Sequence, residues 1–178
     1  MAAPDLDPWL PNPSVRIVHT RGANADRERL WEAARSIRLD QTRLLGRLVR
    51  WRIPGVPARS SFRDLFTHPP FCLLHDEGFV LLTGLVGRIW TLRRDYPRLD
   101  GPGEFRDWNR PGTAKVLLAN WVRPGPDGGA TLHSESRVQA FGVQGRLGLA
   151  GVRPLIRSFQ NLVATDAMAA AVREAERG

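Results

Sequence analysis

The most regular pattern of apolar and polar positions lies in the last third of the chain. From Ala130 to Phe141, apolar or small residues alternate with more polar ones, which predicts a half-buried strand. A largely apolar, partly β-branched stretch, Thr113–Val122, predicts a second strand. Residues 124–129 between them are Pro-Gly-Pro-Asp-Gly-Gly, a composition that favours a tight turn. We therefore expect an antiparallel hairpin.

A helical spacing of apolar residues follows the hairpin. These residues recur at intervals that place them on one helical stripe: Leu155, Ile156, Phe159, Leu162 and Val163. An apolar stripe needs an apolar surface to cover it. We expect this helix to lie across the sheet that contains the hairpin.

Strand-like and helix-like patterns also occur upstream. The pattern predicts strands at 14–20, 71–75, 79–83 and 85–92, helices at 27–37 and 38–51, and short helical turns at 61–66 and 104–108. Residues 1–13 are rich in proline and predict an irregular arm. One strand and two helices before the sheet resumes indicate an α+β order, and 178 residues fit one domain, residues 14–178.

The segment between the hairpin and the apolar helix permits two interpretations. Gly142, Gly145, Gly148 and Gly151 are each three apart and Pro154 follows. Each glycine costs a helix about 1 kcal/mol relative to alanine, so propensity favours a loop with the helix beginning near Pro154. Alternatively, the helix persists and the glycines let it approach the sheet. A phosphate-binding loop is disfavoured, because the spacing fits no glycine-rich fingerprint.

The net charge is high, but it does not by itself identify a partner. The chain carries a formal charge of +8, and Lys115 is its only lysine. Such a charge is typical of proteins that bind nucleic acids or acidic membranes. The arginines, however, are scattered singly and form no dense basic run. We favour a compositional bias and do not expect a nucleic-acid partner.

Reactive residues are sparse. Cys72 is the only cysteine and lies in an apolar run, so we predict a buried small side chain and no cysteine-based zinc site. The four histidines lack metal-ligand spacing, and no nucleophile signature is present. We expect no metal and no cofactor, and we identify no catalytic residue. Without a signal peptide or a membrane-span pattern, a cytoplasmic location is expected.

The alternation of the hairpin divides its residues between two faces. The inner face carries Val116, Leu118, Asn120, Ser134 and Ser136, a mainly apolar wall with a few polar groups. Such walls are typical of pockets that orient an apolar ligand. Alternatively, the polar groups bond to one another or to a buried water.

The outer face carries Lys115, His133, Glu135 and Arg137. We interpret these residues as a cross-strand ion-pair network on a solvated face. Arg88 admits two interpretations: it belongs with this structural set, or it points inward and binds an anionic head group.

Several short motifs, in order, resemble a known superfamily. They are Gly84-x-x-Gly87-Arg88-x-Trp90, Phe105, Pro111-Gly112-x-Ala114-Lys115, Glu135-x-Arg137-Val138 and Val152-Arg153-Pro154. Together they resemble an uncharacterised bacterial group of the START/polyketide-cyclase-like superfamily, also called SRPBCC. The resemblance implies a helix-grip fold, in which a curved antiparallel sheet wraps around a long C-terminal helix. It also implies a cavity between them that holds lipids, polyketides or other apolar molecules.

The resemblance and the residue pattern lead to ranked hypotheses about function. The first is binding of a small, largely apolar ligand between the sheet and the C-terminal helix, by a monomer or weak homodimer. Its predicted contacts are Asn120, Ser134, Ser136, Leu118, Val116, Arg88, Trp90 and Phe159. The second is a cyclase or hydratase in the same cavity, which requires a buried ionisable residue. The third is a basic interaction module for nucleic acid or protein.

Overall fold

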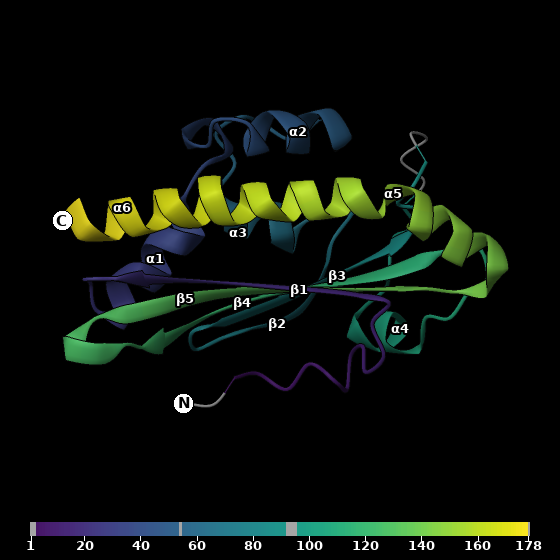
Figure 1. Cartoon of the computed structure of the whole chain (residues 1–178), viewed down its shortest axis with the longest axis horizontal. Coiled ribbons are helices and arrows are strands. Elements are labelled where there is room, and N and C mark those ends of the chain that lie inside the picture. The colour runs from purple at the N-terminus through teal and green to yellow at the C-terminus, as the bar shows by residue number, and fades with distance from the viewer. Residues whose placement is uncertain (1–2, 54, 92–95, 178) are drawn as a thin grey trace.

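One antiparallel sheet and one long helix dominate the fold, as a computed structural model of residues 3–53, 55–91 and 96–177 shows (Figure 1). The five strands are β1 (Val15–Ala23), β2 (Cys72–Glu77), β3 (Val80–Gly87), β4 (Ala114–Pro124) and β5 (Ala130–Ala140). Their order across the sheet is β1-β5-β4-β3-β2, and every neighbouring pair is antiparallel. The α+β prediction is confirmed at this level.

The predicted hairpin is β4 and β5. Its register pairs Asn120 with Ser134, Leu118 with Ser136 and Val116 with Val138. Since side chains alternate between faces, these residues share one face of the sheet. The turn at 126–128 places Asp127 at a φ of 53°, a conformation that Asp tolerates better than most residues.

The C-terminal helix begins directly after β5. It comprises α5 (Gly142–Leu162), a π-helical turn, η3 (Val163–Met168), and α6 (Ala169–Arg177). The loop that propensity favoured for 142–151 is therefore absent, and the helix runs through Pro154. Packing explains this outcome at two of the glycines. A Cβ on Gly145 would lie 3.0 Å from the carbonyl oxygen of Thr113, and one on Gly148 would overlap the Trp90 ring.

The helices between β1 and β2 are shorter than predicted. Helix α1 (Arg27–Ser36) begins at Asp26, whose carboxylate accepts a hydrogen bond from the backbone N–H of Arg29 at 2.8 Å. The predicted helix at 38–51 is instead a 3₁₀ turn, η1 (Leu39–Gln41), followed by α2 (Leu45–Arg52). A third short helix, α3 (Phe62–Thr67), leads into β2.

Strand β3 also ends earlier than the pattern predicted. The predicted strand reached residue 92, but β3 stops at Gly87, whose φ is 139°. The chain then turns, and the backbone N–H of Thr91 donates to the carbonyl of Arg88 at 3.1 Å. Residues 92–95 of the predicted strand and loop lie outside the described residues. Helix α4 (Pro102–Asp107) connects this region to β4.

Apolar cores lie on both faces of the sheet. The inner core, between the sheet and helices α1, α2, α3 and α6, includes Trp31, Leu81 and Met168. The outer core lies beneath α4 and the N-terminal arm, where Leu10 and Phe105 are fully buried. The outer face of the hairpin is therefore covered, and the predicted solvated face is wrong. Lys115, Glu135 and Arg137 have exposed fractions of only 4%, 4% and 9%.

Candidate functional site: an apolar cavity between sheet and helices

The inner side of the sheet encloses a cavity of about 350 Å³. Its floor comes from strands β3, β4 and β5, its roof from the C-terminal helix, and its sides from α1, α2 and α3. Most of the wall is aliphatic or aromatic, for example Val49, Phe62, Leu85 and Ile156. The volume falls in the lower part of the range of about 300–1,000 Å³ that is typical of small-molecule sites.

Six of the predicted contact residues lie in this wall: Val116, Leu118, Asn120, Ser134, Ser136 and Phe159. The first five are on the floor, and Phe159 comes from the roof. They converge because the β4–β5 register aligns alternate residues on the face that α5 covers.

The polar side chains of the floor are unpaired in the part of the chain that the structure describes. Within the described residues, the side chains of Asn120, Ser134 and Ser136 make no hydrogen bond. The predicted alternative, in which they bond to one another, is therefore not what the structure shows. Ser134 and Ser136 are only 6% and 3% exposed, so bulk water does not readily satisfy them. Polar groups that line a cavity without a protein partner are candidates for a ligand's hydrogen bonds.

The polar groups form a band that extends beyond the hairpin. The sheet register places His19 of β1 beside Ser134, and Thr83 of β3 beside Leu118. Both carry a buried atom without a hydrogen-bond partner, Nε2 of His19 and Oγ1 of Thr83. Neither residue was predicted as a contact, although the alternation within 14–20 and 79–83 could have placed both on the inner face.

The roof contributes a further polar group that was not predicted. Gln160 lies in the last turn of α5, is 7% exposed and lines the cavity one residue beyond Phe159. Among the described residues its side chain has no hydrogen-bond partner. Asn120 and Gln160 thus offer amide groups from floor and roof, and an amide both donates and accepts.

The cavity reaches the surface between α2 and α5. Trp51 and Leu155 both line it, yet they are 57% and 67% exposed, which marks its mouth. Arg52 lies in the wall nearby and donates to the carbonyl oxygens of Thr91 at 2.9 Å and Ile89 at 3.4 Å. Its guanidinium lies 5.0 Å from the centre of the Tyr96 ring.

A carboxylate from the C-terminal helix holds α2 beside this mouth. Asp166 lies within the π turn, is 8% exposed and accepts backbone N–H bonds from Arg43, Leu44 and Leu45 at 2.9–3.1 Å. It therefore caps α2 in trans, since Leu44 supplies no side-chain cap. Burial raises the pKa of Asp166, but these three hydrogen bonds outweigh burial and the pKa is lowered.

Arg88 and Trp90 were predicted in the wall and are not among its described residues. Arg88 follows the end of β3 and is exposed, so the inward-pointing interpretation is not what the structure shows. Trp90 packs against Gly148 at the start of α5, beside Val116 and Ile156. The early end of β3 causes both differences, because a continued strand would have kept the alternation.

The outer face carries the charged motif residues, and their contacts are structural. Glu135 binds Arg16 at 2.8 Å and Arg137 at 2.7 Å. Arg137 also donates to the carboxylate of Asp7 at 2.6 Å and to the carbonyl of Leu10 at 2.9 Å, which fastens the N-terminal arm. Burial raises the pKa of Glu135, but the hydrogen bonds from the two arginines outweigh burial and the pKa is lowered.

Lys115 joins α4 to the same face. Its ammonium donates to the carbonyl of Arg106 at 2.7 Å and lies 4.9 Å from the centre of the Phe105 ring. Burial lowers the pKa of Lys115. His133, the fourth residue of this set, stacks on Trp121 with ring centroids 5.0 Å apart. Cys72 is half-buried rather than buried and packs at the edge of the outer core.

The described wall of the cavity lacks the usual groups of acid–base catalysis. It contains no carboxylate, imidazole, thiol or ammonium group; its charged residues are Arg35, Arg52 and Arg63. No group of three or more His, Cys, Asp or Glu residues within the described ranges could hold a metal ion. The described wall therefore supplies apolar contacts and hydrogen bonds, with positive charge from the three arginines and a phenol from Tyr96.

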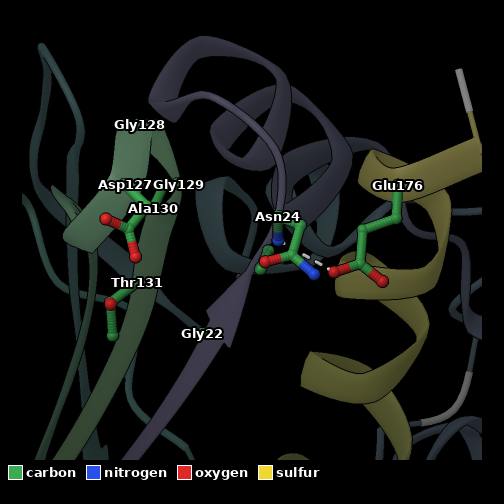
Figure 2. Close-up of a pocket in the computed structure, with 9 residues that line it drawn as sticks. Gly22, Asn24, Asp127, Gly128, Gly129, Ala130, Thr131 and Glu176 are labelled. Carbon is green, nitrogen blue, oxygen red and sulfur yellow. Dashed lines mark hydrogen bonds between the residues drawn. The ribbon is translucent and has the colours of Figure 1, made fainter.

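A second hollow, of about 310 Å³, lies where the β4–β5 turn approaches the end of α6. Figure 2 shows Asp127 and Glu176 on opposite sides of it, with Asn24 between them. Glu176 already accepts the backbone N–H of Asn24 at 2.9 Å. Backbone and exposed polar groups form most of this hollow, so it lacks the buried wall of the cavity described above.

Comparisons with known proteins add little. No protein-family model and no curated protein matches the chain. A solved structure from Thermus thermophilus is 9% identical, with a TM-score of 0.36, and the match covers 90% of this chain and 97% of that one. A structural-genomics target from Nitrosospira multiformis is 10% identical, with a TM-score of 0.29 and coverages of 84% and 94%. Scores this low carry no argument about function.

Proposed function

We propose that this protein binds a small, largely apolar ligand in the cavity between the sheet and the C-terminal helix. The observation that carries the proposal is a set of polar side chains in a mainly apolar wall that have no hydrogen-bond partner among the described residues: Asn120, Ser134, Ser136 and Gln160. Apolar walls supply affinity through burial, and a few fixed polar groups orient the ligand.

We also propose that the sheet and helix form a helix-grip fold, with the sheet curved around the helix, as in the START/polyketide-cyclase-like superfamily. The support is the strand order, the helix that follows β5 and the ordered motifs of the sequence. The motif residues Lys115, Glu135 and Arg137 make the outer-face contacts, which gives them a structural role.

The cavity favours a particular ligand chemistry. Its floor offers hydroxyl and amide groups but no charge, so a neutral molecule with one or two hydroxyl, carbonyl or amide groups fits it. The arginines of the wall come from α1, α2 and α3. A charged group on the floor itself would have no charged partner there, which is costly; an anionic group would have to reach these arginines.

The first test is native mass spectrometry of the protein as purified from cells, which detects a retained ligand as added mass. The second is titration with N-phenyl-1-naphthylamine, a neutral fluorescent probe. The variant Leu118→Trp places a large side chain in the cavity and is expected to abolish probe binding. Val18→Trp is the matched control, because Val18 is 46% exposed and pairs with Glu135 on the outer face. Equal probe binding by wild type and Leu118→Trp would overturn the proposal.

The cyclase or hydratase alternative predicts a different result. General acid–base catalysis needs an ionisable group within reach of the substrate. The described wall supplies none beyond arginine and the Tyr96 phenol, and the nearby imidazole, that of His19, lies in the adjacent strand. Binding is therefore favoured over turnover. Recovery of the retained ligand unchanged after incubation supports binding alone.

A further inference from the structure

Helix α5 exposes an apolar stripe on the side away from its buried residues. Val143, Leu147 and Leu155 are 72%, 69% and 67% exposed. They are spaced four and eight residues apart, and at 100° per residue they fall on one side of the helix. Large exposed apolar side chains grouped in this way mark an interaction surface.

Helix α2 presents a similar stripe across the cavity mouth. Leu44 and Trp51 are 47% and 57% exposed and lie two helical turns apart. Trp51 and Leu155 both line the cavity and are largely exposed, which places both at its mouth. Figure 1 shows α2 and the C-terminal helix on the same side of the sheet. We refer to Leu44, Trp51, Val143, Leu147 and Leu155 as the docking surface.

The charged side chains of α2 and α5 are all positive. Neither contains an aspartate or glutamate. Their exposed charged residues are Arg47 and Arg50 on α2 and Arg146, Arg153 and Arg157 on α5. Five of the chain's exposed arginines therefore lie on the two helices that carry the docking surface.

We propose that the docking surface binds the surface of an anionic phospholipid membrane. Exposed aliphatic and tryptophan side chains insert at the level of the head groups, and flanking arginines attract anionic lipids. The aliphatic groups would contribute nothing to binding a nucleic-acid backbone. A second copy of the chain would bring arginines against arginines, which repel.

Docking in this orientation turns the cavity mouth toward the bilayer. An apolar ligand then passes between membrane and cavity between Trp51 and Leu155 without crossing water. This second step rests on the proposed ligand-binding function. The docking itself does not, because Val143 and Leu147 lie outside the described wall of the cavity.

The experiment is co-sedimentation with phosphatidylcholine vesicles that contain or lack phosphatidylglycerol. Wild-type protein is expected to sediment with the anionic vesicles and to be released by added salt. The double variant Arg146→Gln/Arg157→Gln is expected to lose about fivefold in binding per arginine. These side chains make no hydrogen bond or ion pair within the described residues, so the fold is retained. Arg106→Gln/Arg110→Gln, on α4 and just after it, is the control for the loss of two exposed arginines elsewhere; because these arginines lie over the Trp9 and Trp108 rings, its melting temperature is measured alongside.

A second pair of variants tests the apolar contribution. Leu147→Glu is expected to weaken vesicle binding at least about tenfold. The substitution removes an apolar side chain that would be buried in the membrane and adds a negative charge that anionic lipids repel. Val18→Glu makes a comparable change on the outer face of β1 and is expected to bind vesicles as wild type does. Circular dichroism and melting temperature check that each variant is folded.

The outcomes separate the two proposals. Vesicle binding that is lost in Leu147→Glu, with N-phenyl-1-naphthylamine binding unchanged, supports docking. Docking without probe binding by wild type retains the membrane proposal and overturns the ligand proposal. Absence of wild-type binding to anionic vesicles, or equal binding by Leu147→Glu, overturns docking. Binding to nucleic acid or to an acidic protein in place of vesicles overturns it as well.

Discussion

The two faces of the β4–β5 hairpin use alternate residues of the same strands in opposite ways. On the outer face, Glu135 and Arg137 are charged, buried and fully engaged with each other and with Arg16 and Asp7. On the inner face, the neighbouring Ser134 and Ser136 are uncharged, equally buried and without partners in the described chain. Satisfied groups stabilise a fold, whereas unsatisfied groups remain available to a ligand.

The two faces also differ in how closely other elements pack against them. The outer face is covered by α4 and the N-terminal arm, which pack in direct contact with it. The inner face is covered by the C-terminal helix and α2, which leave a cavity of about 350 Å³. The comparison predicts that outer-face substitutions affect stability and that inner-face substitutions affect binding.

The largest effect is expected for Glu135→Gln. Removing the carboxylate takes one of two charge partners from the buried Arg137, which keeps Asp7, and also removes the partner of Arg16; we expect a cost of about 3 kcal/mol. Urea denaturation measures the loss. The control is Glu174→Gln, which removes the exposed pair with Arg177 and is expected to cost less than about 1 kcal/mol. Similar losses in both variants would contradict the role of the outer face.

Gly148→Ala tests how closely the roof packs where it meets the sheet. A Cβ at this position would overlap the Trp90 ring, and the expected cost is about 2 kcal/mol. Gly151→Ala is the matched control in the same helix, where a Cβ would contact nothing within 4 Å. That variant is expected to gain about 1 kcal/mol from helix propensity alone. Thermal denaturation of both variants would show whether the signs differ.

Asp166→Asn tests the one inner-side carboxylate that binds α2. Loss of the charged cap is expected to cost about 1 kcal/mol at neutral pH. The folded pKa is lowered, so this stabilisation is complete above the unfolded value of about 3.9 and is lost as the pH falls through the folded pKa. Urea midpoints of wild type and variant should therefore converge in acid. Asp107→Asn, at an exposed position, is the control; a gap that persists in acid would contradict the mechanism.

The smallest effect on stability is expected on the cavity floor. Asn120→Leu and Ser134→Ala replace unpartnered polar groups with apolar ones, which is expected to change stability by less than about 0.5 kcal/mol. The same variants should weaken binding of an alcohol three- to tenfold while leaving binding of the matching hydrocarbon unchanged. Titration calorimetry with such a pair measures the difference. A large loss of stability would show that the floor is structural.

The hairpin and its two faces were predictable because strand alternation is a local property. A period of two fixes which of Asn120 and Trp121 faces inward, whatever lies beyond the strand. The cover of the outer face was not predictable in this way. It depends on Asp7 and Leu10 meeting Arg137, residues that lie far apart in the sequence.

Helix propensity failed at the glycine-rich start of α5, where tertiary packing decides the outcome. Gly145 and Gly148 disfavour a helix in isolation, but here the absence of a side chain permits close approach to Thr113 and Trp90. Gln160 and Asp166 were also missed. The directions in which these two side chains point depend on how the helix is rotated about its axis and on its π turn. No local sequence pattern specifies either.

The π turn determines how α6 is rotated about the helix axis relative to α5. A π turn holds one residue more than an α turn, so deleting one residue within 163–168 would restore a continuous α-helix. Everything beyond the deletion would rotate by about 100° relative to α5. The alanines of α6 would then leave the core while Phe159 still faced the floor. A single extra residue thus allows one continuous helix to point Phe159 of α5 at the cavity floor and the alanines of α6 at the core.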